Sequence, residues 1–146
     1  MKGVIQRVAH ANVVVDGETV GEIGQGIMLL LGVEPEDTEA VADKMLHKVL
    51  GYRIFSDADG RMNLSLKDIA GELLVVSQFT LAADTRKGMR PGFSTAAKPD
   101  HAERLYEYFS AEASKSVTVA NGRFGADMKV SLLNDGPVTF LMDIQP

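Results

Sequence analysis

The sequence predicts an α+β fold in which mostly antiparallel strands form β-sheets and two main helices pack on the outside. Strand-like apolar runs separated by turn residues dominate the first third of the chain and return at its end. Two segments with the 3.6-residue apolar period of a helix lie between them. With 146 residues and no visible repeat, residues 1–146 are expected to form a single domain.

Turn residues separate the first strands. Residues 13–15 are valines, and Asp16-Gly17 and then Thr19-Val20 follow them. Asp-Gly suits the two-residue type I′ turn, so this segment predicts a β-hairpin. A second turn at residues 24–26 leads into residues 27–31, which are short and apolar enough for a buried strand.

Two helices are expected, each with a start signal. Apolar residues recur every three to four positions over residues 38–50, with Pro35 and Asp37 before this segment and Gly51 after it. Asp100 is the predicted N-cap of the second helix, and Glu103 occupies the capping-box position.

The remaining apolar runs predict further strands. Residues 72–81 form the clearest core strand, while the long connection over residues 82–99 is of a length often found in functional loops. Asp57-Ala58-Asp59-Gly60 lacks the later ligands of a calcium loop and is interpreted as a turn. Residues 117–122 indicate another hairpin. Other strands are expected at residues 52–55, 130–133 and 138–142.

Composition narrows the function. The chain has no cysteine, which excludes thiolate chemistry. Its net charge of −5 argues against a protein that coats nucleic acid. The longest aliphatic run is too short to cross a membrane, so a cytoplasmic protein is expected. One segment differs, since residues 85–98 contain basic side chains and no acidic one. This segment is either a solvated loop or a site of phosphate contacts. Its basic residues are Arg86, Lys87, Arg90 and Lys98.

Histidine chemistry is not supported. The only histidines are His10, His47 and His101, and none lies in a recognisable triad or has metal-ligand spacing. No segment matches a phosphate-binding glycine loop. We therefore expect neither a metal ion nor another cofactor.

Two polar segments interrupt apolar runs. Residues 77–81 read Ser-Gln-Phe-Thr-Leu, and residues 134–139 read Asn-Asp-Gly-Pro-Val-Thr. If the first segment is a strand, Ser77 and Phe79 share one face, while Gln78 and Thr80 share the other. Glycine admits a ligand close to the backbone and proline lacks an N–H, so the Gly-Pro step predicts carbonyls that point out of the sheet.

These segments resemble the signature motifs of the D-aminoacyl-tRNA deacylases. Further stretches are similar to family sequence in the same order, and the resemblance covers essentially the whole chain. They are residues 5–8, 51–55, 89–91 and 123–128.

The resemblance implies a homodimeric editing enzyme that hydrolyses the ester between a D-amino acid and the 3′-terminal adenosine of tRNA. The Gly-Pro peptide is expected to be cis and to insert its carbonyls into the neighbouring subunit's site, where they exclude L side chains but admit D-amino acids and glycine. The tRNA 2′-hydroxyl is expected to assist the reaction. The implied catalytic residues are Ser77, Gln78, Phe79 and Thr80. Those implied for substrate binding and chiral selection are Gly136, Pro137, Asn134, Thr139, Arg7, Phe124 and Met128.

Two other functions remain open from the residues. One is a non-catalytic RNA-binding module that uses the basic loop, although aromatic residues are few. The other is an esterase with Thr80 or Ser77 as its nucleophile, although neither has an evident base to activate it.

Overall fold

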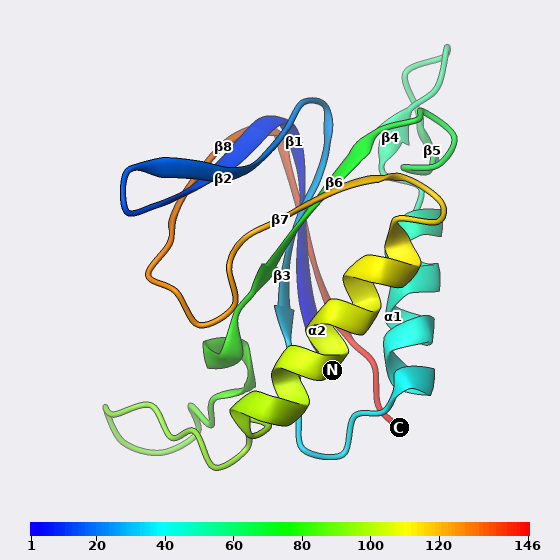
Figure 1. Cartoon of the computed structure of the whole chain (residues 1–146). Coiled ribbons are helices and arrows are strands. Elements are labelled where there is room, and N and C mark those ends of the chain that lie inside the picture. The colour runs from blue at the N-terminus through cyan, green and yellow to red at the C-terminus, as the bar shows by residue number, and fades with distance from the viewer.

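The structure, a computed structural model, describes all 146 residues (Figure 1). One six-stranded sheet and one two-stranded sheet combine with two helices, and a short 3₁₀ helix follows the fourth strand of the larger sheet along the chain. The larger sheet contains β1 (Lys2–Val15), β2 (Glu18–Ile23), β3 (Gly26–Gly32), β6 (Glu72–Ser77), β7 (Thr118–Asn121) and β8 (Lys129–Asp143). The other elements are β4 (Phe55–Ser56), β5 (Met62–Leu64), α1 (Glu39–Gly51), α2 (Pro99–Ala113) and the 3₁₀ helix η1 (Phe79–Ala82).

Strand β1 organises the larger sheet. Along one edge it pairs with β3 and then with β2, and along its other edge it pairs with β8, all antiparallel. Strands β3, β6 and β7 continue the sheet in parallel. Helices α1 and α2 lie side by side on one face of this sheet (Figure 1). The predicted α+β class with mostly antiparallel pairing is confirmed.

The sheet has a core on each face. On β3, Ile27 and Leu29 pack into the larger core with the helices, whereas Met28 packs into a second core on the opposite face. The residues of β6 alternate in the same way, so both strands are buried on both faces. This explains their unbroken apolar sequences, which are typical of parallel strands covered on both sides.

Strand β1 changes sides between the two cores. Ile5 belongs to the larger core, but Val8 and Val13 belong to the second. The pairing of β1 with β8 shifts register twice between Gln6 and His10, and such bulges bend a strand. The end of β1 and strand β2 therefore fold over the second face of the sheet and close its core.

The predicted β-hairpin is confirmed. Asp16 and Gly17 separate β1 from β2 and have φ values of 50° and 78°. Positive φ at both central residues is the requirement of a type I′ turn. The turn before β3 is also where it was expected.

Helix α1 was predicted to within one residue at each end, but its start signal was wrong. Thr38 is the N-cap, and its hydroxyl accepts a hydrogen bond from the Val41 N–H at 3.3 Å. The buried carboxylate of Asp37 instead binds the α-ammonium group of Met1 at 2.8 Å and the Glu34 N–H at 2.7 Å. Asp37 therefore joins the chain terminus to the turn before α1.

Helix α2 starts before its predicted cap. Its first residue is Pro99, and Lys98 is an N-cap without a side-chain hydrogen bond. Proline at the first helical position has a suitable φ and lacks an N–H that would have no partner there. Asp100 consequently lies in the first turn, so its prediction as the N-cap, with Glu103 in a capping box, was wrong. Neither helix combines the length and apolar composition needed to cross a membrane.

Four strand predictions need correction. The core strand expected over residues 72–81 ends at Ser77, and of residues 52–55 only Phe55 lies in a strand. Strand β7 pairs in parallel with β6, so residues 117–122 form no hairpin. The two closing strands are one continuous strand, β8, because its pairing with β1 resumes beyond the register shifts.

Candidate active site

The first signature segment begins where β6 ends. Gln78 leaves the strand with its N–H bonded to the carbonyl of Leu31 at 2.8 Å, and η1 starts at the next residue. The side-chain amide of Gln78 donates to the hydroxyl of Thr80 at 2.5 Å. The expected strand alternation over residues 77–80 is therefore wrong, because the backbone turns after Ser77.

A cavity of about 520 Å³ lies against this turn. Ser77, Gln78 and Phe79 line it together with Phe124 and Met128, which come from the connection between β7 and β8. The long connection before α2 and the first turns of α2 supply other walls. Ten of the 15 lining residues are hydrophobic, which suits a flat, largely apolar group such as a nucleobase. Thr80 does not line the cavity.

A buried polar network supports one wall of the cavity. The Tyr106 hydroxyl donates to the carbonyl of Val75 at 2.9 Å and accepts from the Asn121 amide at 3.1 Å. The same amide donates to Ser110 at 2.6 Å, and the Tyr106 ring lies 6.0 Å from that of Phe124. Burial raises the pKa of the Tyr106 phenol. Sequence reasoning missed this network, since no motif marks it.

The second signature segment lies elsewhere in the chain. Asn134, Gly136, Pro137 and Thr139 are exposed residues of β8, and none of them lines the cavity. The Gly136–Pro137 peptide bond is cis, and Gly136 has a φ of 136°. A Cβ atom added at Gly136 would lie 2.7 Å from the Cγ2 atom of Val138, so this position has no room for a side chain.

Arg7 holds the second segment against β1 and the turn after α1. Its Nε group donates to the carbonyl of Asp135 at 2.9 Å and lies 3.5 Å from the Asp135 carboxylate. A second guanidinium nitrogen donates to the carbonyl of Ile54 at 2.8 Å. The side chain is only 13% exposed, so the guanidinium group is a fixed part of this region.

The long connection before α2 is closed at its base. The backbones of Asp84 and Gly92 exchange hydrogen bonds of 2.8 and 3.3 Å, and the residues between them form an exposed tip. Arg86 donates to the Asp84 carboxylate twice through its side chain, at 2.8 Å each, and these bonds hold the pKa of that carboxyl well below its usual range. The four basic residues predicted to contact phosphates thus differ in their free charge, because Arg86 is neutralised by Asp84 within its own loop. Lys87, Arg90 and Lys98 form no ion pair.

No imidazole lines the cavity. His10 and His47 are exposed, while His101 is half-buried with Nε2 2.8 Å from the carbonyl of Asp37. No group of three or more histidine, aspartate or glutamate side chains is placed to hold a metal ion. The polar groups at the cavity are therefore the hydroxyl of Ser77, the amide of Gln78, the carboxylate of Asp127 and backbone groups.

Comparisons with known proteins agree with this geometry. The chain is 67% identical over 141 residues to the D-aminoacyl-tRNA deacylase of Pseudoalteromonas translucida (strain TAC 125), covering 96% of this chain and 97% of that protein. It is 63% identical to the protein of the same name from Stutzerimonas stutzeri (strain A1501), covering 98% and 99%.

Solved structures share the fold. One described as c-Myc DNA Unwinding Element Binding Protein has a TM-score of 0.95 at 40% identity and covers 100% of both chains. A probable eukaryotic D-amino acid tRNA deacylase has a TM-score of 0.85 at 18% identity, covering 98% of each chain, which shows the likeness of fold alone. Residues 4–143 match the family model described as D-Tyr-tRNA(Tyr) deacylase. The chain therefore belongs to the D-Tyr-tRNA(Tyr) deacylase family.

Proposed function

We propose that residues 1–146 form one D-aminoacyl-tRNA deacylase domain that hydrolyses the ester between a D-amino acid, or glycine, and the terminal adenosine of tRNA. The observation that carries this proposal is the apolar cavity beside the turn at Ser77–Thr80, which suits an adenosine with its ester next to backbone donors. Family membership supports the same substrate class. The enzyme acts in the cytoplasm, where aminoacyl-tRNA is used.

Backbone donors at the turn are suited to stabilise the developing oxyanion. In a 3₁₀ helix the first N–H groups have no acceptor inside the helix, and in η1 these belong to Phe79 and Thr80. The N–H before them, that of Gln78, is already bonded to Leu31. Paired N–H donors aimed at a tetrahedral oxyanion commonly contribute a factor of about 10²–10³ each to the rate.

The nucleophile is water rather than a protein side chain. Its oxygen attacks the ester carbonyl, the bond from the carbonyl carbon to O3′ breaks, and O3′ takes a proton. The tRNA 2′-hydroxyl next to that oxygen assists this transfer. Thr80 is a poor nucleophile because its hydroxyl accepts the Gln78 amide and no imidazole lines the cavity to activate it.

The chiral filter comes from a second copy of the chain. Within one chain the Gly136-Pro137 segment is exposed and lines no part of the cavity, although Arg7 fixes it in place. Leu133 and Leu141 on the same strand are 54% and 71% exposed, as expected for an interface surface. In a homodimer this segment inserts into the partner's cavity. Its carbonyls pack against the substrate Cα, where they exclude every L side chain without selecting among D side chains.

Hydrolysis of matched D-, L- and glycyl-tRNA tests the activity. We expect release of the amino acid from the D and glycyl substrates and none from the L substrate. Equal rates on the D and L substrates would contradict the filter.

A substrate that ends in 2′-deoxyadenosine tests the nucleophile. Its rate of hydrolysis should fall far more than the rate of the Thr80→Ala or Ser77→Ala variant falls on the normal substrate. Robust hydrolysis of the deoxy substrate, or a trapped acyl-enzyme, would indicate that a protein hydroxyl is the nucleophile.

Sedimentation at micromolar concentration tests the dimer independently. We expect a single species of twice the chain mass. A fully active monomer would contradict the assignment of the filter to a partner.

A further inference from the structure

Two exposed aromatic rings meet at the rim of the cavity. The side chains of Phe79 and Phe93 are 57% and 42% exposed, and their ring centroids are 5.2 Å apart at an interplanar angle of 50°. Both residues also line the cavity. Packing within this chain leaves much of both rings in water, so the pair is available to a ligand that leaves the cavity over its rim.

Phe93 is held in place although its loop is exposed. It follows Gly92, which closes the loop base by pairing with Asp84, and its own carbonyl accepts from the Ala96 N–H at 3.0 Å. The hydroxyl of Thr95 donates to the carbonyl of Ala82 at the end of η1. These contacts tie the backbone around Phe93 to the same turn that carries Phe79, and the ring of Phe93 packs against that of Phe79.

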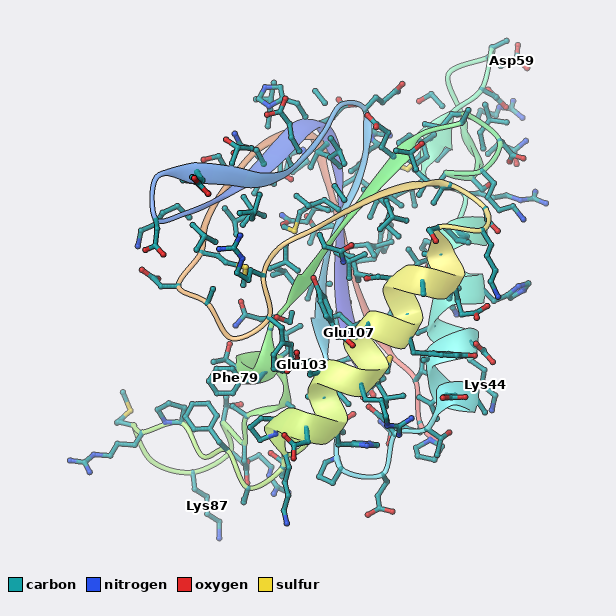
Figure 2. All side chains as sticks on the ribbon, in the orientation of Figure 1. Lys44, Asp59, Phe79, Lys87, Glu103 and Glu107 are labelled. Atoms are coloured by element: carbon teal, nitrogen blue, oxygen red, sulfur yellow. The ribbon has the colours of Figure 1, made fainter.

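Positive charge lies beyond the aromatic pair. Lys87 and Arg90 are exposed on the loop tip and pair with no carboxylate, unlike Arg86. Figure 2 shows Phe79 above the loop that carries Lys87, which points outward. Aromatic rings that stack bases, next to cations that follow the backbone, form the usual site for single-stranded nucleic acid.

We propose that Phe79 and Phe93 form a stacking site for the unpaired nucleotide that precedes the terminal adenosine, and that Lys87 and Arg90 contact phosphates further along the strand. This inference rests on the proposed function, because it takes the cavity as the adenosine site. The strand must leave the cavity across its rim, and the aromatic pair lies there. Stacking makes no demand on base identity, so the site holds the 3′ end without reading the tRNA sequence.

Truncated substrates separate this site from the cavity. We compare hydrolysis of a D-aminoacyl ester of adenosine with that of the same ester on cytidylyl-adenosine, which adds one nucleotide. Phe93→Ala should lower kcat/KM about tenfold more for the dinucleotide than for the adenosine ester, mainly through KM. Phe93→Tyr keeps the ring and should retain the advantage of the dinucleotide, whereas Phe93→Leu keeps only apolar bulk and should lose it.

Met89→Ala is the matched control, because this side chain lies on the same loop and is fully exposed.

A binding measurement without catalysis uses a short oligonucleotide with 2-aminopurine before its terminal adenosine. Binding to the wild-type protein should quench the fluorescence, and Phe93→Ala should remove most of the quenching.

Two results would overturn the inference. One is an equal loss on both esters in Phe93→Ala, which would make Phe93 a wall of the cavity only. The other is an unchanged preference for the dinucleotide in Phe93→Leu. If the wild-type protein hydrolyses neither ester nor aminoacyl-tRNA, the proposed function has failed, and quenching of the oligonucleotide still tests the stacking site.

Discussion

The two signature segments of this chain are built in opposite ways. Residues 77–79 leave a buried strand and line a cavity formed by their own chain, and a short helical turn begins at Phe79. Residues 134–139 continue along an exposed strand and line no part of that cavity, yet Arg7 and the pairing with β1 hold them firmly. One segment is complete within a single chain, whereas the other is ordered but has nothing to act on. The proposed insertion of the Gly136-Pro137 segment into a partner's cavity would explain this difference.

The largest effect is expected from Gly136→Ala. At a φ of 136°, with Val138 only 2.7 Å from the added Cβ atom, the backbone of residues 135–138 must move. Displacements of about 1 Å at a reacting group can cost about 10²-fold in rate, so we expect a loss of that order on D-aminoacyl-tRNA, or hydrolysis of the L substrate.

Gly60→Ala is the control for Gly136→Ala. Gly60 also has a positive φ, of 80°, but nothing lies within 4 Å of its added Cβ atom. It should lower the melting temperature without changing chiral discrimination. Equal kinetic losses in both variants would show that the effect is one of general stability.

A smaller loss is expected from Arg7→Ala. The change removes hydrogen bonds to the carbonyls of Asp135 and Ile54, and bonds from a charged donor are each worth about 1.5–3 kcal/mol. We expect a fall of about 3 kcal/mol in the free energy of unfolding by urea, together with a loss of chiral discrimination. Arg7→Lys keeps the charge but cannot donate in both directions, so it should recover little of either. Full recovery would mean that charge alone fixes the segment.

Tyr106→Phe tests the cavity side of the comparison. The variant should lose about 1 kcal/mol of stability at neutral pH, because the carbonyl of Val75 keeps its bond from the Gly122 N–H at 3.0 Å. Burial raises the pKa of Tyr106, so its contribution is fully present below the unfolded pKa of about 10 and falls as pH rises through the folded value. Urea unfolding between pH 8 and 11 should show this alkaline decline in the wild type and a weaker one in the variant. Parallel profiles would exclude Tyr106 as its source.

The smallest effect concerns salt. Replacing Lys87 and Arg90 with alanine should weaken tRNA binding and flatten its salt dependence by about 0.7 in slope for each single-strand phosphate that the protein no longer neutralises. Arg86→Ala should change the slope less, because its guanidinium group is already engaged by Asp84. Filter binding between 50 and 200 mM salt measures both. If Arg86→Ala changes the slope by half as much as the double variant, the loop acts only through total charge.

Features of the fold that depend on neighbouring residues were predicted from the sequence, whereas features that depend on residues distant in the chain were not. The hairpin at Asp16-Gly17 and the body of α1 follow from local turn chemistry and apolar period, and the sequence located both. Phe79 and Leu81 alternate with polar residues as in a strand, so this local pattern does not mark the end of β6 at Ser77. That end depends on the bond from Gln78 to Leu31, which is distant in sequence.

The candidate site followed the same rule. Both signature segments were identified from sequence. Their separation in one chain was expected only from the family resemblance, because it depends on how β8 pairs with β1 and no local pattern marks it. The Gly-Pro step was predicted to divide two strands, yet the ladder resumes on both sides of it. The Tyr106–Asn121 network was missed because its members come from different elements and share no motif.

The outer edge of β8 also affects how the chain avoids unwanted association. This strand runs for 15 residues and pairs only on its β1 side, which leaves a long row of backbone donors and acceptors open to any extended peptide. Pro137 interrupts that row because it has no N–H. Pro137, proposed to keep L-aminoacyl-tRNA out of the hydrolytic site, thus also protects the newly made, still unpaired chain against aggregation.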